Sequence, residues 1–307
     1  MLYRTRTRLI LVLLLTLSLS GCLFRSHKVQ MRMSTAALQT ATREQLVDIV
    51  NSEAARIQTL DATVDMDASV GGSVKGKITE YQEIRGYILV RQPEMLRMIG
   101  LYPIVRNRAF DMVSDGESFK LFLPSKNQFI IGKNEMSQRS TKPLENLRPQ
   151  HIYDALLLRH IDPETEIAVL EHGTEEVVDP KTRKMAIQPD YVLDVISRDD
   201  HHWYLERKIT FSRIDLEPER QVIYDKFGYV TSDVHYQNLQ DYGETRFPSL
   251  ITIWRPIEEY SVTIAMVKLT FNKPLTDEQF VLAQPAGSQL LDLDKPHNGN
   301  GGSTQPR

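Results

Sequence analysis

Residues 62–70 have the sequence ATVDMDASV, in which five apolar residues from Ala62 to Val70 alternate with polar ones. Alternation with a period of two predicts a β-strand that has one buried and one solvent-facing side. Similar runs follow along most of the chain, and Asp115-Gly116 between two of them is a strong hairpin signal. The pattern therefore predicts a long antiparallel meander.

The other predicted strands lie on both sides of a helical interruption. They span Lys77–Ile84, Gly86–Arg91, Met95–Leu101, Ala109–Ser114, Ser118–Leu123, Gln128–Gly132, Ile167–Glu171, Tyr191–Ile196, Trp203–Phe211, Gln221–Phe227, Thr231–Asn238, Leu250–Trp254 and Tyr260–Asn272. A sheet of more than about ten strands must curl, because each strand adds right-handed twist. We therefore expect a mainly β fold with an α lid: a single large, strongly curved antiparallel sheet that forms an open (half) β-barrel, with helices packed on its concave side.

Two segments depart from the β pattern. Thr42 and Gln45 fit a capping box, and apolar residues then recur at helical spacing, which predicts a helix over 43–60. Pro149 suits the first turn of a second, shorter helix within 144–159. Little besides these two helices is left to cover the concave side of the sheet.

The first 22 residues carry an export signal. Three arginines precede the 11-residue apolar run Leu9–Leu19, which is shorter than the roughly 20 residues that a membrane-spanning helix needs. The run ends in Leu19-Ser20-Gly21-Cys22, which resembles a bacterial lipobox and predicts lipidation of Cys22; an uncleaved N-terminal anchor is the alternative. Leu23 rather than Asp follows the cysteine, as in lipoproteins that a Gram-negative-type bacterium sorts to its outer membrane, facing the periplasm.

Composition sets further bounds on the 307-residue chain. A net charge of -3 excludes a generally basic nucleic-acid binder, and the single cysteine excludes an intramolecular disulfide and any multi-cysteine metal site. We expect a signal peptide at 1–21, a lipidated N-terminus with a flexible tether at 22–41, a half-barrel domain at 42–294 and a disordered tail at 295–307.

Three groups of residues carry a resemblance to a known family. They are Gly86–Pro93 followed by Leu96-Arg97-Met98, Ser114-Asp115-Gly116 followed by Leu121–Pro124 and Gln128, and Phe280 followed by Pro285-Ala286-Gly287. In their order and spacing they resemble the lipoprotein-localisation (LolA/LolB) superfamily, including its lipidated members. The resemblance implies an open β-barrel of about eleven strands with a helical lid, and a hydrophobic cavity that holds acyl chains.

One position departs from the soluble carriers of that family. They have an arginine immediately before the proline that helps to control lid opening, whereas this chain has Gln92 there and Arg91 one residue earlier. A shift of one residue on a strand changes the face to which a side chain points. The resemblance therefore favours an anchored acceptor or another lipid-handling protein over a shuttling carrier.

Apolar residues that share one side of the predicted strands are the candidates for a ligand cavity. They are Leu96, Met98, Phe119, Leu121, Tyr191, Leu193, Val195, Trp203, Leu205, Ile209 and Phe211. Polar neighbours such as Arg97 and Glu206 mark the opposite side of the strands. The alternative is that the apolar residues simply fill a core beneath the helices.

A second candidate is the apolar loop Gly100–Val105. Leu101, Tyr102 and Ile104 are the residues with which such a loop would enter a membrane during release of cargo. The alternative is a buried connection between strands, because apolar loops usually pack against the protein.

No pattern of residues supports catalysis or a resident metal. Asp199-Asp200-His201-His202 is the best metal candidate, but adjacent residues on a strand point to opposite faces, and two aspartates suit a hairpin turn. The sequence contains no Gly-x-Ser-x-Gly or His-Glu-x-x-His motif. We therefore expect neither enzyme activity nor a cofactor.

Two functions remain. The first is a membrane-anchored periplasmic lipoprotein that binds acyl chains of lipoproteins or lipids, in a LolB-like acceptor role for outer-membrane sorting. Its partners would be the outer membrane, reached through the N-terminal lipid, the acyl-chain ligand, and a periplasmic carrier or envelope-assembly protein. The second is a structural or assembly lipoprotein that uses the same fold as a protein-interaction surface.

Overall fold

The computed structural model describes residues 33–72, 76–135, 148–179 and 181–295. The predicted signal peptide, the lipidation site Cys22 and all of the predicted tail except Lys295 lie outside the described residues. The chain forms two compact units, Met1–Ala36 with Glu175–Gln188, and Ala37–Thr174 with Pro189–Arg307. We call them the smaller and the larger unit.

In the smaller unit, the described N-terminal residues pair with the tip of a hairpin. The Ser34 amide donates to the carbonyl of Ile187 at 2.9 Å, and the Thr35 amide donates to Oδ2 of Asp179 at 2.7 Å. The other oxygen of Asp179 accepts the amides of Lys181 and Thr182. These backbone hydrogen bonds, from Thr182 and Thr35 above all, hold the pKa of Asp179 well below its usual range.

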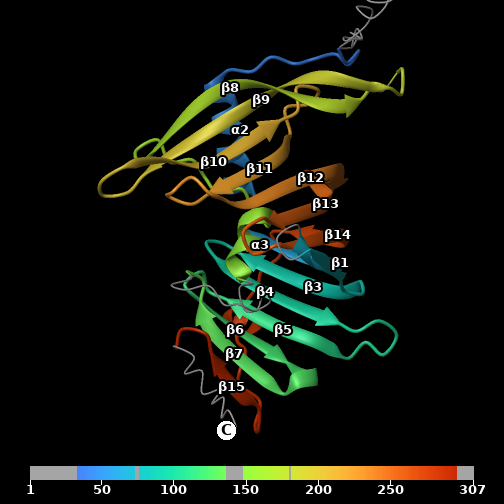
Figure 1. Ribbon diagram of the computed structural model, residues 1–307, viewed down its shortest axis with the longest axis vertical. Helices are drawn as coiled ribbons and strands as arrows, with labels where there is room; N and C mark the ends of the chain where they lie inside the picture. Colours follow the sequence, from blue (N-terminus) through green and yellow to red (C-terminus); the bar gives the residue numbers. More distant parts are fainter. Residues whose placement is uncertain (1–32, 73–75, 136–147, 180, 296–307) are drawn as a thin grey trace, which may run out of the picture. The chain divides into compact units, whose positions relative to one another are not determined.

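Fifteen strands form one sheet (Figure 1). They are β1 (Thr59–Gly72), β2 (Lys77–Glu80), β3 (Ile84–Arg91), β4 (Met95–Leu101), β5 (Arg108–Ser114), β6 (Ser118–Leu123), β7 (Gln128–Lys133), β8 (Glu166–Val178), β9 (Met185–Arg198), β10 (Trp203–Phe211), β11 (Pro218–Tyr224), β12 (Val230–Tyr242), β13 (Thr245–Arg255), β14 (Tyr260–Phe271) and β15 (Gln289–Asp292). Their order is β15-β7-β6-β5-β4-β3-β1-β14-β13-β12-β11-β10-β9-β8, with β2 paired to β1. The two ends of this order do not pair within the described chain, so the sheet is an open half-barrel and the predicted fold class is confirmed.

The order shows how the chain builds the curve. Strand β1 lies in the middle, because it pairs with β3 on one side and with β14 on the other. The chain runs outward from β1 through β3 to β7, crosses to β8 at the opposite end, and returns through β9 to β14. The neighbouring strands whose registers are known are antiparallel, apart from β15, which pairs with β7 in parallel. The segment predicted as one strand, Lys77–Ile84, contains β2 and only the first residue of β3.

Helix α2 (Arg43–Arg56) begins at the predicted capping box. The Gln45 amide donates to Oγ1 of Thr42 at 3.3 Å, and the Thr42 amide donates to Oε1 of Gln45 at 2.8 Å. The prediction that the helix continues to Leu60 is wrong, because β1 already begins at Thr59. Asn272, which follows β14, stops the helix: its side-chain Nδ2 donates to the Arg56 carbonyl at 2.9 Å, and its Oδ1 accepts the amide of Gln58.

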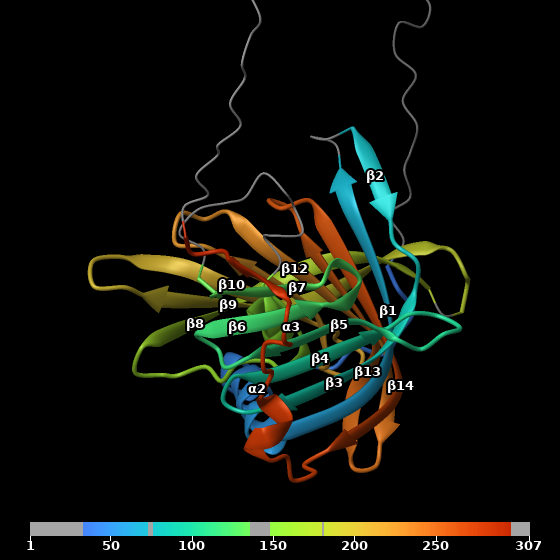
Figure 2. The same cartoon turned by 90° about the horizontal axis from the view of Figure 1, so that it is seen from below.

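Helix α3 (Pro149–Leu156) confirms the shorter predicted helix, with Pro149 in its first turn. It contacts β4, β5 and β13, and Figure 2 shows it inside the curve of the strands. Two short 3₁₀ turns, η2 (Pro124–Lys126) and η4 (Asp277–Phe280), complete the regular structure of the described chain. Among the described residues, no helix is both long and apolar enough to span a bilayer.

A single apolar cluster joins the two helices to the sheet. Leu46 and Val50 of α2 and Tyr153 and Leu156 of α3 pack in it against residues from both halves of the strand order. We call the sheet face that carries this cluster the inner face. Burial of this apolar surface is the main stabilising contribution to the larger unit.

Candidate functional site

Most of the predicted cavity residues lie on the inner face. Seven of the eleven candidates belong to the main apolar cluster and are at most 3% exposed: Leu96, Met98, Tyr191, Leu193, Val195, Ile209 and Phe211. They come from β4, β9 and β10, so strands from both halves of the sheet contribute to one surface. In this conformation they are core residues beneath the helices.

Phe119 and Leu121 of β6 lie outside the main cluster. Phe119 is buried, and the guanidinium carbon of Arg148 lies 5.3 Å from the centre of its ring. Leu121 is half-buried. The strand register nevertheless places both on the inner face. Leu121 pairs with Met112, which pairs with Met98, and Phe119 is connected in the same way through Ser114 to Leu96.

Trp203 and Leu205 correct the prediction that all the candidates share one face. Trp203 is 50% exposed, and Leu205 lies opposite Ile196 rather than on the side of Val195. The cause is a β-bulge, because Leu205 pairs with Ile196 while Arg207 pairs with Val195. The extra residue reverses the alternation of β10 before Arg207, so an apolar pattern with constant parity in the sequence changes sides in the sheet.

Arg207 shares the inner face with Ile209, because the two residues lie two positions apart on β10 and Arg207 pairs with Val195. Arg207 is 3% exposed, and its Nη2 lies 3.7 Å from Oε2 of Glu166. Glu166 also pairs with Arg159 at 2.6 Å, and Arg159 forms a second ion pair with Glu206. A charge at the edge of the apolar cluster is thus compensated by carboxylates.

The space between the helices and the sheet is almost completely filled. A cavity between α2, the residues after α3 and strands β11 to β13 has a volume of about 20 Å³, which is room for about one water molecule. Its lining is mostly apolar and includes Ile57, Leu156 and Phe247. An acyl chain therefore fits the inner face only if a helix moves away from it.

Gln92 connects the sheet to the end of α2. Its Nε2 donates to the carbonyls of Ala54 at 2.7 Å and Ile57 at 2.8 Å, and its amide donates to the carbonyl of Gln58. This is the position before the proline at which the soluble carriers of the resembling family have an arginine. An uncharged side chain here makes a direct contact with the helix that covers the inner face.

Asn51 makes a second polar contact between α2 and the rest of the larger unit. Its Nδ2 donates to the Ile161 carbonyl at 3.1 Å, and its Oδ1 accepts the Ile161 amide at 2.7 Å. Together with the contacts of Gln92, these hydrogen bonds fix both the middle and the end of α2. Each contributes on the order of 1 kcal/mol, so they are individually easy to break.

Several acidic groups at the helix–sheet boundary have raised pKa values. Burial raises the pKa of Glu53 on α2 to about 7, and the charge of Glu217 adds to the effect. Burial also raises the pKa of Asp154 on α3 to about 6, against the opposing hydrogen bond that Gln150 donates to it. Sequence analysis missed Glu53, although its place between Val50 and Ala54 puts it on the apolar stripe of the helix.

The apolar loop between β4 and β5 is exposed. Leu101 ends β4 and is half-buried, but Ile104 is 97% exposed, and Tyr102 is also exposed. Ile104 has a φ of 67°, an unusual value for a β-branched residue. The alternative of a buried connection is wrong for Ile104, and an apolar side chain points into solvent at this turn.

Asp199 forms the predicted hairpin turn. Its Oδ1 accepts the amides of His201 at 2.8 Å and His202 at 2.6 Å, and these hydrogen bonds lower its pKa. The carboxylate therefore serves the backbone of the turn.

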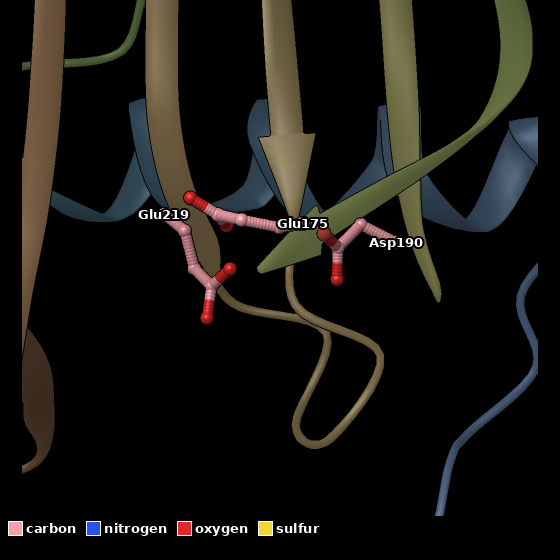
Figure 3. A group of neighbouring side chains, drawn as sticks. All are labelled: Glu175, Asp190 and Glu219. Carbon is pink, nitrogen blue, oxygen red and sulfur yellow. The ribbon is translucent and has the colours of Figure 1, made fainter. Parts of the chain in front are cut away.

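Figure 3 shows two further carboxylates of the larger unit, Asp190 on β9 and Glu219 on β11. Asp190 is buried, although nothing in its local sequence distinguishes it from a surface aspartate. Its burial follows from its place near the centre of a long strand, which only the pairing of the sheet defines.

Comparison with known proteins gives matches at the level of structure. No family model and no curated protein sequence matches the chain. A LolA superfamily protein from Nitrosomonas europaea is 15% identical over 79% of this chain and 99% of its own, with a TM-score of 0.49. A DUF1329 family protein from Desulfovibrio piger is 15% identical over 79% of this chain and 98% of its own, with a TM-score of 0.50.

The chain shares the fold of the Desulfovibrio protein. At such low identity the likeness concerns the fold alone.

Proposed function

We propose that this protein is a lipid-anchored periplasmic lipoprotein that binds the acyl chains of lipoproteins or lipids on its inner face, in a LolB-like acceptor role at the outer membrane. The observation that carries the proposal is the apolar surface shared by both halves of the open sheet, which α2 and α3 cover in the described chain. Replacing a helix by acyl chains would keep that surface out of water.

The energetics of binding need no metal or cofactor. Each methylene group that leaves water contributes about 0.8 kcal/mol, so one long acyl chain offsets the loss of several helix contacts. Helix α2 is the element to move, because only Leu46 and Val50 of its 14 residues are fully buried. Gln92 would act as the latch, since its two side-chain hydrogen bonds must break when the end of α2 lifts.

The exposed loop between β4 and β5 supports delivery at a membrane. Tyr102 and Ile104 present apolar surface, while Arg106 and Arg108 follow them with positive charge. Such a loop would insert its apolar tip below the lipid headgroups and place its arginines at the phosphates. Two or three acyl chains on Cys22 would hold the protein at that membrane.

The test uses the full chain with Cys22→Ala, purified without detergent. It should be recovered free of membranes and bind a fluorescent fatty-acid probe at about one site per chain. Gln92→Ala should bind the probe more tightly, because the closed state loses its latch. The control is Arg85→Ala, which removes a surface ion pair with Asp65 on β1. Absence of probe binding to both the parent and the Gln92→Ala chain contradicts the proposal.

The filled interior favours a second function, a structural or assembly lipoprotein that uses the same fold to bind a protein. Under that alternative the cavity of about 20 Å³ never enlarges. A stable protein partner, together with probe binding that is absent even in Gln92→Ala, would support it.

A further inference from the structure

Two carboxylates lie where a small, mostly apolar cavity opens towards solvent. Glu53 of α2 and Glu217, the residue before β11, line the small cavity beneath the helices together with apolar residues such as Leu157 and Phe247. The same two carboxylates also line an open depression of about 300 Å³, with Asp48, Ser52 and Arg56 from the outer side of α2 among its other walls. Glu53 and Glu217 therefore connect the small apolar cavity with the open depression. We call this depression the acidic mouth of the cavity.

Negative charge exceeds positive charge at the mouth, because its lining includes three carboxylates, from Asp48, Glu53 and Glu217, and one cation, Arg56. The carboxylate of Glu53 makes no hydrogen bond or ion pair with another residue of the described ranges, and Arg56 lowers its pKa only through its charge. Arg246 lies 4.0 Å from Glu217, but its closer partner is Asp215 at 3.2 Å. Burial and then the charge of Glu217 raise the pKa of Glu53, while burial and the charge of Asp215 raise the pKa of Glu217. A cation between them would relieve their repulsion.

Tyr236 provides an independent indication of a ligand. Its side chain is 8% exposed and lines the same cavity as Glu53 and Glu217. Its hydroxyl has no hydrogen-bond partner in the described part of the chain. A buried hydroxyl without a partner is costly, and an oxygen of a ligand would satisfy it.

We propose that Glu53 and Glu217 bind the ammonium group of an amphiphile whose acyl chains lie on the inner face, while the Tyr236 hydroxyl donates to an ester or amide oxygen of the same molecule. This inference rests on the proposed acyl-chain binding and adds the chemistry of the headgroup. An ammonium close to acyl chains occurs in ethanolamine phospholipids and in the free α-amine of a diacylglyceryl-cysteine peptide.

The test compares two probes with equal chains, dodecylammonium and dodecanoate, by calorimetry at pH 7.5. The protein is the full chain with Cys22→Ala. The parent should bind dodecylammonium about tenfold more tightly than dodecanoate, because a charge-assisted contact is worth about that factor. Glu53→Gln and Glu217→Gln should each remove most of this preference, whereas the control Asp67→Asn, which removes an exposed charge of β1, should keep it.

The outcomes separate the headgroup inference from acyl binding. Equal affinity of the parent for both probes, or a preference that survives Glu53→Gln, overturns the inference while leaving acyl binding intact. Binding of neither probe overturns both. The same variants are then tested with phosphatidylethanolamine and with a diacylglyceryl-cysteine peptide, with and without N-acetylation. Loss of peptide binding on acetylation identifies the peptide amine as the source, and Glu53-dependent binding of the phospholipid identifies the lipid headgroup.

The Tyr236 contact has its own readout. Tyr236→Phe removes only an unpartnered hydroxyl, so it should not lower the folding stability and should leave the affinity for dodecylammonium unchanged. It should weaken binding of the ester-containing probes by about tenfold. Unchanged affinity for those probes would remove Tyr236 from the site.

Discussion

The two helices on the inner face differ in what holds them there. In α3, four of eight residues are buried, Pro149, Tyr153, Ala155 and Leu156, and no side chain caps its first turn. In α2, two of 14 residues are fully buried, and a capping box stabilises its beginning. Helix α3 thus depends on tertiary packing, whereas α2 has local signals of its own and polar contacts with the sheet.

The two helices are therefore not equally free to move away from the sheet. A helix that keeps its own cap and meets the sheet through hydrogen bonds and a titratable carboxyl can detach at low cost. A short helix wedged between β4 and β13 cannot leave without opening the core. We therefore infer that α2 can move away from the inner face, whereas α3 stays in place.

Truncation of a buried leucine in each helix is the most severe test. Leu156→Ala in α3 should lower the free energy of unfolding by about 3 kcal/mol, because it leaves a cavity in the core. Leu46→Ala in α2 should lower it by only about 1 kcal/mol, because α2 can detach before the rest unfolds. Denaturant titration gives both values, and equal losses would contradict the assignment.

The raised pKa of Glu53, which lies on α2, predicts that the folding stability of the protein depends on pH. A carboxyl whose pKa is about 7 when folded and about 4.5 when unfolded binds its proton more tightly in the folded state. Its contribution to stability is therefore present at low pH and is lost as the pH rises from about 4.5 to 7. Glu53→Gln should be more stable than the parent by about 3 kcal/mol at pH 8 and nearly equal to it at pH 4.5.

The measurement is urea unfolding of parent and variant at both pH values. Asp154 of α3 also has a raised pKa and is present in both proteins, so the difference between them isolates Glu53. A difference that does not change with pH would show that Glu53 is not protonated in the folded state near neutrality.

Loss of the Gln92 side chain should loosen α2 alone. Gln92→Ala removes two hydrogen bonds to the end of the helix, worth about 1–2 kcal/mol together. Amide hydrogen exchange in the last turns of α2 should become about tenfold faster, while α3 keeps its protection. Equal acceleration in both helices would mean that they open as one unit.

The comparison also separates what the sequence could predict from what it could not. The capping box of Thr42 and Gln45 was predicted, because its partners are three residues apart. The end of α2 was not, because Asn272 reaches it from more than two hundred residues away in the chain. Alternation predicted the strands, but the change of sides at Leu205 required the pairing of β10 with β9.

The candidate site shows the same division. Leu193 and Ile209 were found from alternation because both lie on regular stretches of strand. Glu53 was treated as a polar interruption, although its position on the apolar stripe of α2 was a usable signal. Its proximity to Glu217 could not be predicted, because the two residues are far apart in the chain and only the fold brings them to one cavity.

The cap of α2 provides the test with the smallest expected effect. Thr42→Ala removes the side chain that accepts the Gln45 amide and should lower helix stability by about 1 kcal/mol. If α2 detaches on its own, hydrogen exchange should increase in its first turn while the midpoint of global unfolding barely moves. Thr42→Ser, which keeps the hydroxyl, is the matched control. A fall in global stability as large as that expected for Leu156→Ala would instead show that α2 and α3 are equally essential to the core.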